Sequence, residues 1–250
     1  MADSTRLAAL RALACSPGAA RAIVAADDWI AHGLGRGQLH ELFAGADEGA
    51  SLTGFAVALT LAAAATPILW LRTDRAQRDG GRLYATGLHE LGLDPAALVL
   101  AVVEDEAALL RAAGDATRCP GFGTVVLEAW GRAPGIDLTA TRRLQLAAEG
   151  SGVTALILRL DAQPVPSAAA TRWRVAPCPS TPLDADAPGG PTFLIDLERR
   201  RGGHAGQRWR VEWDRDTQRF SAAPLSGAGL SLAADRPAAR DPAAPLRRHG

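Results

Sequence analysis

Ala44-Gly45-Ala46-Asp47-Glu48-Gly49-Ala50-Ser51 is the stretch of this sequence that decides the fold. It has the length and position of a phosphate-binding loop of the form G-x-x-x-x-G-K-[ST], because a strand-like run (39–43) precedes it and a helix-like run (52–65) follows it. We call residues 44–51 the phosphate loop. A loop of this kind between a strand and a helix predicts a nucleotide-binding architecture.

The phosphate loop departs from a working loop at the positions that bind phosphate. Ala44 replaces the first glycine, and Ala50 replaces the lysine that reaches the β- and γ-phosphates. All 27 basic residues of the chain are arginine, so the lysine has not moved to a neighbouring position. Asp47 and Glu48 add negative charge where a phosphate would lie. We therefore expect no ATPase activity and no nucleotide cofactor, and we assign the degenerate site to Gly45, Gly49, Ala50 and Ser51.

Composition is typical of a globular cytoplasmic protein. The 250 residues are 48% apolar with no net charge, so no global field attracts nucleic acid or a membrane. The absence of lysine resembles a genome-wide codon bias, so the arginine content alone does not indicate nucleic-acid binding. The three cysteines are scattered, which predicts neither a disulfide framework nor a metal site. The longest apolar run, 55–65, is too short to span a bilayer.

The pattern downstream of the phosphate loop predicts alternating strands and helices. Short apolar runs are separated by helical spans of 8 to 15 residues, which is typical of βαβ units with a parallel sheet buried on both faces. Beyond residue 170, alternating runs predict one more strand and an antiparallel hairpin added to the sheet edge. The fold class is thus α/β, with a mostly parallel central sheet, flanking helices and a C-terminal antiparallel hairpin. The expected strands are 38–43, 67–72, 98–103, 123–128, 153–160, 173–176, 192–198 and 209–213, and the expected helices are 52–65, 81–91, 104–117 and 138–149.

Three regions divide the chain. Residues 1–34 form an N-terminal helical segment with an apolar stripe too small for a core of its own, which predicts an element that contacts another protein. Residues 35–220 form the core domain. Residues 221–250 are rich in Ala, Pro, Gly and Arg, and we expect a disordered tail. The stripe consists of Leu7, Leu10 and Leu13.

The core resembles that of the RecA-like recombinases over about residues 35–220. The run 41–43 resembles the strand before the recombinase phosphate loop, 69–74 the strand that ends in the catalytic carboxylate, and 125–130 the strand with the Walker B acid. The segment 84–98 resembles the connection to the third strand, and 198–209 the basic hairpin. Together with the degenerate phosphate loop, this layout resembles the ImuA family.

The resemblance to the ImuA family implies a function without catalysis. That family comprises RecA-like accessory proteins of bacterial mutagenic translesion DNA synthesis, which are induced under DNA damage. They are understood to act with ImuB, a polymerase-like protein that lacks catalytic residues, and with an error-prone polymerase. The recombinase RecA is a further candidate partner. Two alternatives are a SulA-type inhibitor of cell division, whose chains are generally shorter, and a residual DNA-dependent ATPase, against which the missing lysine argues.

The same resemblance assigns roles to individual positions. Asp74 stands where recombinases place the glutamate that positions the attacking water, and Glu128 stands at the Walker B position. We interpret both as vestigial, and we expect no bound metal. The loops 129–135 and 161–167 correspond to DNA-binding loops but are short for that role, so direct DNA contact stays open. The arginines of the hairpin turn are candidate contacts to a protein partner or DNA, with a solvated charged turn as the alternative: Arg199, Arg200 and Arg201.

Overall fold

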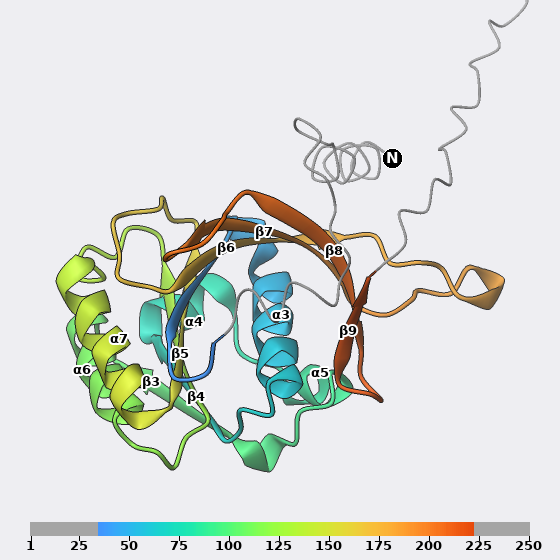
Figure 1. Cartoon of the computed structure of the whole chain (residues 1–250). Helices are drawn as coiled ribbons and strands as arrows, with labels where there is room; N and C mark the ends of the chain where they lie inside the picture. Colours follow the sequence, from blue (N-terminus) through green and yellow to red (C-terminus); the bar gives the residue numbers. More distant parts are fainter. Residues whose placement is uncertain (1–34, 223–250) are drawn as a thin grey trace, which may run out of the picture.

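The computed structural model describes residues 35–222. The predicted apolar stripe of the N-terminal segment (Leu7, Leu10 and Leu13) lies outside the described residues, as does the predicted tail beyond residue 222. Within the described part, nine strands form one sheet in the order β3-β2-β4-β5-β1-β6-β7-β8-β9 (Figure 1). No helix in this part has both the length and the apolar content needed to cross a membrane.

The sheet is parallel from β3 to β6 and antiparallel from β7 to β9, which confirms the predicted α/β class with its C-terminal antiparallel strands. The parallel part consists of β1 (Leu39–Ala44), β2 (Ile68–Thr73), β3 (Leu98–Val103), β4 (Thr124–Trp130), β5 (Thr154–Leu160) and β6 (Thr171–Cys178). The antiparallel part consists of β7 (Thr192–Arg200), β8 (Gln207–Asp214) and β9 (Arg219–Ala222). The strand β9 was not predicted, and it extends two residues beyond the expected end of the core at 220.

The helices differ from prediction on one side of the sheet. The expected helix over 81–91 is replaced by α4 (Asp74–Gly80) and α5 (Ala85–Glu90), with extended chain between them. The polar segment after β2 becomes helical because Thr73 caps it: its Oγ1 accepts a hydrogen bond from the Ala76 N–H at 3.1 Å. Elsewhere the predicted helices are present as α3 (Gly49–Ala62), α6 (Glu106–Thr117) and α7 (Leu138–Ser151).

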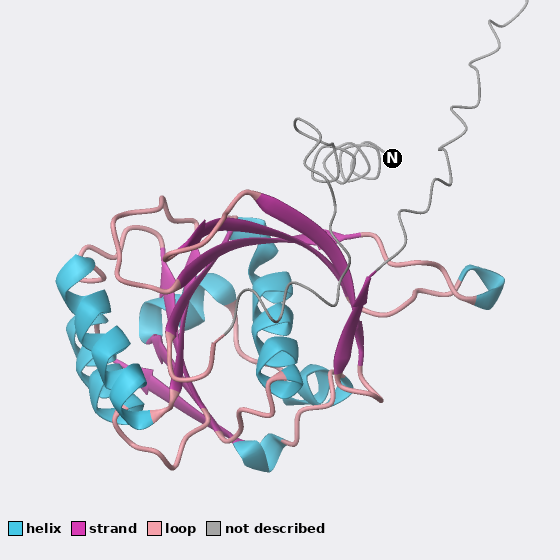
Figure 2. Ribbon diagram, viewed as in Figure 1, coloured by secondary structure: helices cyan, strands magenta, loops and turns pink. Residues whose placement is uncertain are grey.

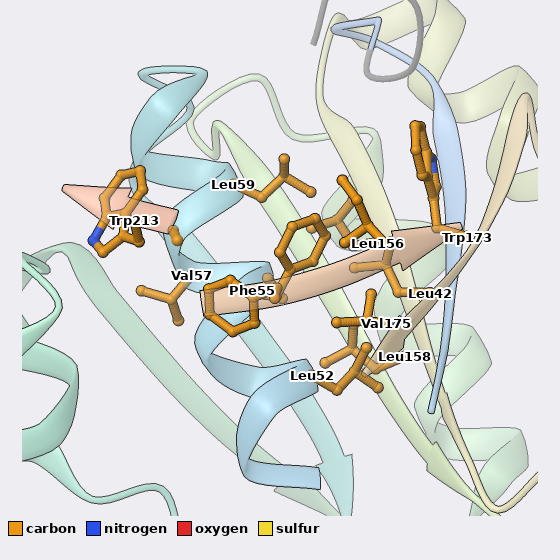
Figure 3. Close-up of a cluster of buried hydrophobic side chains, with 14 of the residues drawn as sticks. Leu42, Leu52, Phe55, Val57, Leu59, Leu156, Leu158, Trp173, Val175 and Trp213 are labelled. Carbon is orange, nitrogen blue, oxygen red and sulfur yellow. The ribbon is translucent and has the colours of Figure 1, made fainter. Parts of the chain in front are cut away.

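The helix α3 lies in the concave side of a curved sheet. Figure 2 shows the strands arching over it, and α3 contacts β1, β5, β6 and β9. Its sequence is apolar around almost the whole circumference, which is the composition expected of a helix enclosed on several sides. Aromatic rings of the antiparallel strands complete this core, with the Phe55 ring 5.4 Å from that of Phe193 and 5.5 Å from that of Phe220. Figure 3 shows Phe55 of α3 in the same buried cluster as Leu42 and Leu156 of the sheet.

The helices α6 and α7 cover the opposite face of the sheet. Leu109 and Leu144 are among their fully buried side chains, and they pack with residues of β1, β2, β4 and β5. Both helices begin at an aspartate whose carboxylate accepts a backbone N–H: Asp105 from Ala108 and Asp137 from Ala140, each at 2.7 Å. The sheet is therefore buried on both faces, as its continuous apolar runs require.

One buried polar side chain on β1, that of His40, makes the stability of this core depend on pH. His40 is fully buried, with Nε2 3.0 Å from the Gly35 carbonyl oxygen and Nδ1 2.7 Å from the Thr171 hydroxyl oxygen. The carbonyl can only accept, so Nε2 carries the proton and Nδ1 accepts from the hydroxyl. Burial lowers the pKa of His40 to about 4. The folded protein therefore keeps this imidazole neutral at pH values where the unfolded chain protonates it.

We predict that His40 makes the protein acid-sensitive. Because the folded pKa is about 4 and the unfolded pKa about 6.5, the unfolded state binds the extra proton between these values. The contribution of His40 is complete above pH 6.5 and falls by about 3 kcal/mol as pH drops to 4. Urea unfolding at a series of pH values should show this slope, and His40→Gln should remove it. An unchanged slope in His40→Gln, or an equal effect of exposed His89→Gln, would contradict the assignment.

Candidate functional site

The phosphate loop is shorter in the structure than its sequence suggests. The strand β1 ends at Ala44, Gly45 is extended, and one 3-10 turn (Ala46–Glu48) leads directly into α3 at Gly49. The helix was expected from residue 52, so it begins three residues earlier than predicted. The chain between strand and helix is therefore a single tight turn rather than a wide loop that encircles a phosphate.

The carboxylate of Glu48 closes this turn. Its Oε2 accepts the Gly45 N–H at 2.6 Å, and the Glu48 N–H donates to the Gly45 carbonyl at 3.1 Å. In a working loop, backbone N–H groups of this region are the phosphate ligands. Here one of them binds an internal anion, which would also repel a phosphate. The two neighbouring acids of the loop have different environments: the Glu48 carboxylate binds the loop backbone, whereas Asp47 is exposed.

The indole of Trp130 covers the first turn of α3. Trp130 is the last residue of β4, and its ring lies between Gly49, which opens α3, and Gly80, which ends α4. A methyl group on Gly80 would lie 2.4 Å from the Trp130 Cζ2 atom, and one on Gly49 would lie 3.3 Å from it. The Trp130 indole therefore packs inside the degenerate site.

The Walker B position is a buried hydrogen-bonding centre. Both oxygens of Glu128 are in use: Oε1 accepts from Arg72 Nη2 at 2.7 Å and from Trp130 Nε1 at 2.9 Å, and Oε2 accepts from Trp70 Nε1 at 2.9 Å. The side chains of Arg72 and Glu128 are 2% and 3% exposed. A magnesium ion would need carboxylate oxygens and water at this position. The residues present therefore do not fit a magnesium–nucleotide complex.

The arginines that follow one another from the end of β2 have different environments. Arg72 is buried and also donates to the Ala76 carbonyl at 2.9 Å. Arg75 and Arg78 are exposed on α4. Asp74 is the exposed first residue of α4, rather than part of a loop.

A small cavity remains beside the closed turn. Its volume is about 290 Å³, and its walls include Ala50, Thr53, Arg82 and Trp130. That volume is at the lower end of the range for ligand sites. Of the predicted degenerate-site residues, Gly49 and Ala50 line this cavity. Within residues 35–222, no group of three or more His, Cys, Asp or Glu side chains is arranged to hold a metal ion.

The hairpin arginines are divided between internal contacts and the turn. Arg199 Nη2 donates to the Ala169 carbonyl at 2.6 Å and to the Ser167 hydroxyl at 3.2 Å. Arg201 pairs with Glu149 of α7 at 3.1 Å. Arg200 packs its side chain against Gly203 in the turn. Two of the three candidate contact residues therefore hold the hairpin to the core.

A second buried ionic group was missed by the sequence analysis. On β1, Glu41 accepts hydrogen bonds from Arg172 Nη2 at 2.8 Å and from the Ser167 hydroxyl at 2.7 Å. The guanidinium groups of Arg159 and Arg172 lie 5.8 and 5.3 Å, respectively, from the centre of the Phe43 ring. The available signal was Glu41 inside β1 and Arg159 inside β5, two strands that are mostly apolar. This group fixes the segment after β5, where the sequence suggested a short DNA-binding loop.

We predict that breaking the Arg72–Glu128 pair destabilises the fold strongly. Arg72→Met should lower the free energy of unfolding by about 3–5 kcal/mol, because it leaves the buried Glu128 charge without its cation. Arg72→Met combined with Glu128→Gln should regain part of that loss, since glutamine carries no charge and its one carbonyl oxygen still accepts from one of the two indole N–H groups. Urea unfolding measures both. Arg75→Met, which removes an exposed pair with Asp79, should change stability by less than about 0.5 kcal/mol. Equal effects of Arg72→Met and Arg75→Met would contradict the prediction.

Comparison with known proteins identifies relatives for half of the chain. Protein ImuA from each of two Caulobacter vibrioides strains is 41% identical over 135 residues, which is 50% of this chain and 54% of the relative. The match thus spans about half the length of these curated relatives. No protein-family model matches the chain.

Comparison with solved structures identifies the fold. The crystal structure of the RadB recombinase superimposes with a TM-score of 0.52 and covers 79% of this chain and 96% of its own. Sequence identity in that superposition is 14%, so it shows the fold alone. The chain is therefore a homologue of Protein ImuA over half of its length, and its core has the RecA-like α/β fold.

Proposed function

We propose that this chain is a non-catalytic RecA-like accessory protein of the bacterial mutagenic translesion-synthesis complex that is induced by DNA damage. In this role it binds the polymerase-like protein ImuB. The observation that carries the proposal is that the chain's own side chains engage the groups that would bind phosphate and magnesium, which leaves only a small cavity. Glu48 binds a loop amide, Trp130 covers the start of α3, and Glu128 is held by Arg72. A RecA-like core without a phosphate site has only its surfaces for function.

The homology to ImuA supports the choice of complex. Identity of 41% over half the chain is compatible with a shared role, and the resemblance noted in the sequence supplies the candidate partners. These are an ImuB-like protein first, an error-prone polymerase with it, and the recombinase RecA as a further candidate. A residual DNA-dependent ATPase is disfavoured, because the lysine is missing and the site is filled from inside.

One feature of the sheet also supports a protein-binding role. The strand β3 pairs only with β2 and forms one edge of the sheet. Its side chains are all apolar, and Val99, Leu100 and Val102 are 50%, 41% and 40% exposed. Edge strands of soluble proteins usually carry charges, prolines or bulges that prevent pairing with other chains. The bare apolar edge of β3 fits a protein that works inside an assembly.

We predict that the purified protein neither binds nor hydrolyses ATP. Turnover should stay at background with and without single-stranded DNA, and titration of a fluorescent ATP analogue should give no saturable binding below about 1 mM. Ala50→Lys alone should not restore binding, because Glu48 and Trp130 still fill the site. DNA-stimulated turnover that Ser51→Ala abolishes would overturn the non-catalytic assignment.

We also predict a stable complex with the ImuB-like protein of the same genome. Co-expression and affinity capture should recover the two chains together, and adding ATP or ADP with Mg²⁺ should leave the yield unchanged because no nucleotide is bound. Size-exclusion chromatography with light scattering then gives the stoichiometry. Recovery of each protein alone, at concentrations up to about 10 µM, would contradict the proposed function.

A further inference from the structure

The outer surface of α6 and α7 carries a groove that the degenerate site does not explain. Figure 1 shows the two helices side by side on the face of the sheet away from α3. A hollow of about 500 Å³ lies between them, larger than the cavity beside the phosphate loop. Its apolar walls come from Leu110 and Leu144, and Gly114 and Ala140 leave it open because they lack bulky side chains.

The rim of this groove is basic. Arg111, Arg118 and Arg143 line it, and Arg142 is exposed next to it on α7. Arg118 lies 3.7 Å from Asp115 in an exposed pair. Among residues 35–222, the other three arginines form no ion pair. Asp115 and Asp137 offset two of the three lining arginine charges, so the surface keeps an excess of positive charge that Arg142 increases.

Further exposed apolar side chains lie on α7 outside the groove. Leu138 and Leu146 of α7 are 52% and 59% exposed, and Arg142 lies between them at a spacing of four residues. Residues four apart lie on one side of a helix, so these three form a leucine–arginine–leucine stripe. A surface that alternates exposed leucine with unpaired arginine matches the apolar face and acidic margins of an amphipathic helix.

We infer that the α6–α7 surface is the docking site for an acidic, leucine-bearing helix of the polymerase-like partner. Leucines of that helix enter the groove, and its carboxylates pair with Arg111 and Arg143. The inference rests on the proposed function for the identity of the partner, but the chemistry of the surface stands without it. A groove with an apolar wall suits a protein helix, whose leucines it can bury, better than a nucleic acid backbone.

Charge complementarity also argues against two other occupants. In a symmetric contact with a second copy, the basic surface would meet itself. The chain's own residues 223–250 contain four arginines and two aspartates, so they share the sign of the groove. An acidic helix from a different protein is therefore the occupant that the surface fits.

The test reverses charge on the groove and on a matched surface. We expect Arg111→Glu/Arg143→Glu to weaken binding of the ImuB-like protein about tenfold or more in isothermal titration calorimetry, because rim charges steer and hold a complementary partner. Arg75→Glu/Arg78→Glu, two exposed arginines of α4, should stay within about twofold. Leu146→Ser should weaken binding several-fold without changing the salt dependence. Circular dichroism verifies that each variant is folded.

A synthetic helical peptide with leucines spaced three and four residues apart and glutamates between them separates the two proposals. If the partner binds wild type and the groove variant equally, the inference is overturned while the proposed function stands. If the partner binds neither wild type nor the groove variant, the proposed function fails. In that case, binding of the peptide to wild type but not to the groove variant still supports the groove as a docking site. No peptide binding to wild type overturns the groove in that case. Two further results would overturn the inference. One is binding of a single-stranded DNA oligonucleotide that is lost only in the groove variant, and the other is self-association that is lost only in that variant.

Discussion

The structure around the former nucleotide site depends on the hydrogen bonds that Glu128 accepts. One carboxylate binds Arg72 and Trp70 of β2 and Trp130 at the end of its own strand. Arg72 in turn donates to the Ala76 carbonyl of α4, so the same group joins two strands and a helix. Burying this ion pair is costly, and two further nitrogens of Arg72, Nε and Nη1, are buried without an acceptor. The pair therefore specifies an arrangement more than it adds net stability.

That arrangement explains why the site is closed from two directions. The Glu128 carboxylate holds the Trp130 indole against Gly49 and Gly80, at positions where a Cβ atom on Gly80 would collide with the ring. From the other direction, Glu48 binds the Gly45 amide. A phosphate would have to displace a carboxylate from the turn and an indole from the helix start. The loss of the lysine is thus one of several changes, and the others fill the space it leaves.

The sequence predicted the sheet well because the signal for it is local. Each of the strands β1 to β5 is a short, mostly apolar run next to a helical span, and each was predicted to within about two residues. The burial of Arg72 could not be predicted this way, because its partner Glu128 lies 56 positions away in the sequence. The helix α4 was missed because its polar sequence has no apolar period, and it forms through the Thr73 cap. The position of Glu48 was predicted, but its bond to Gly45 depends on a turn shorter than expected.

A filled nucleotide site has a consequence for regulation under the proposed function. A ligand can shift a conformational equilibrium only by as much as its affinity differs between the two states. A chain that binds no nucleotide cannot use ATP hydrolysis to alternate between partner-binding and partner-releasing forms, as an active RecA-like ATPase can. Its affinity for a partner is then fixed by the exposed surfaces, namely the β3 edge and the basic groove between α6 and α7. Under the proposed function, control of such a protein acts through the amounts of the chain and its partners.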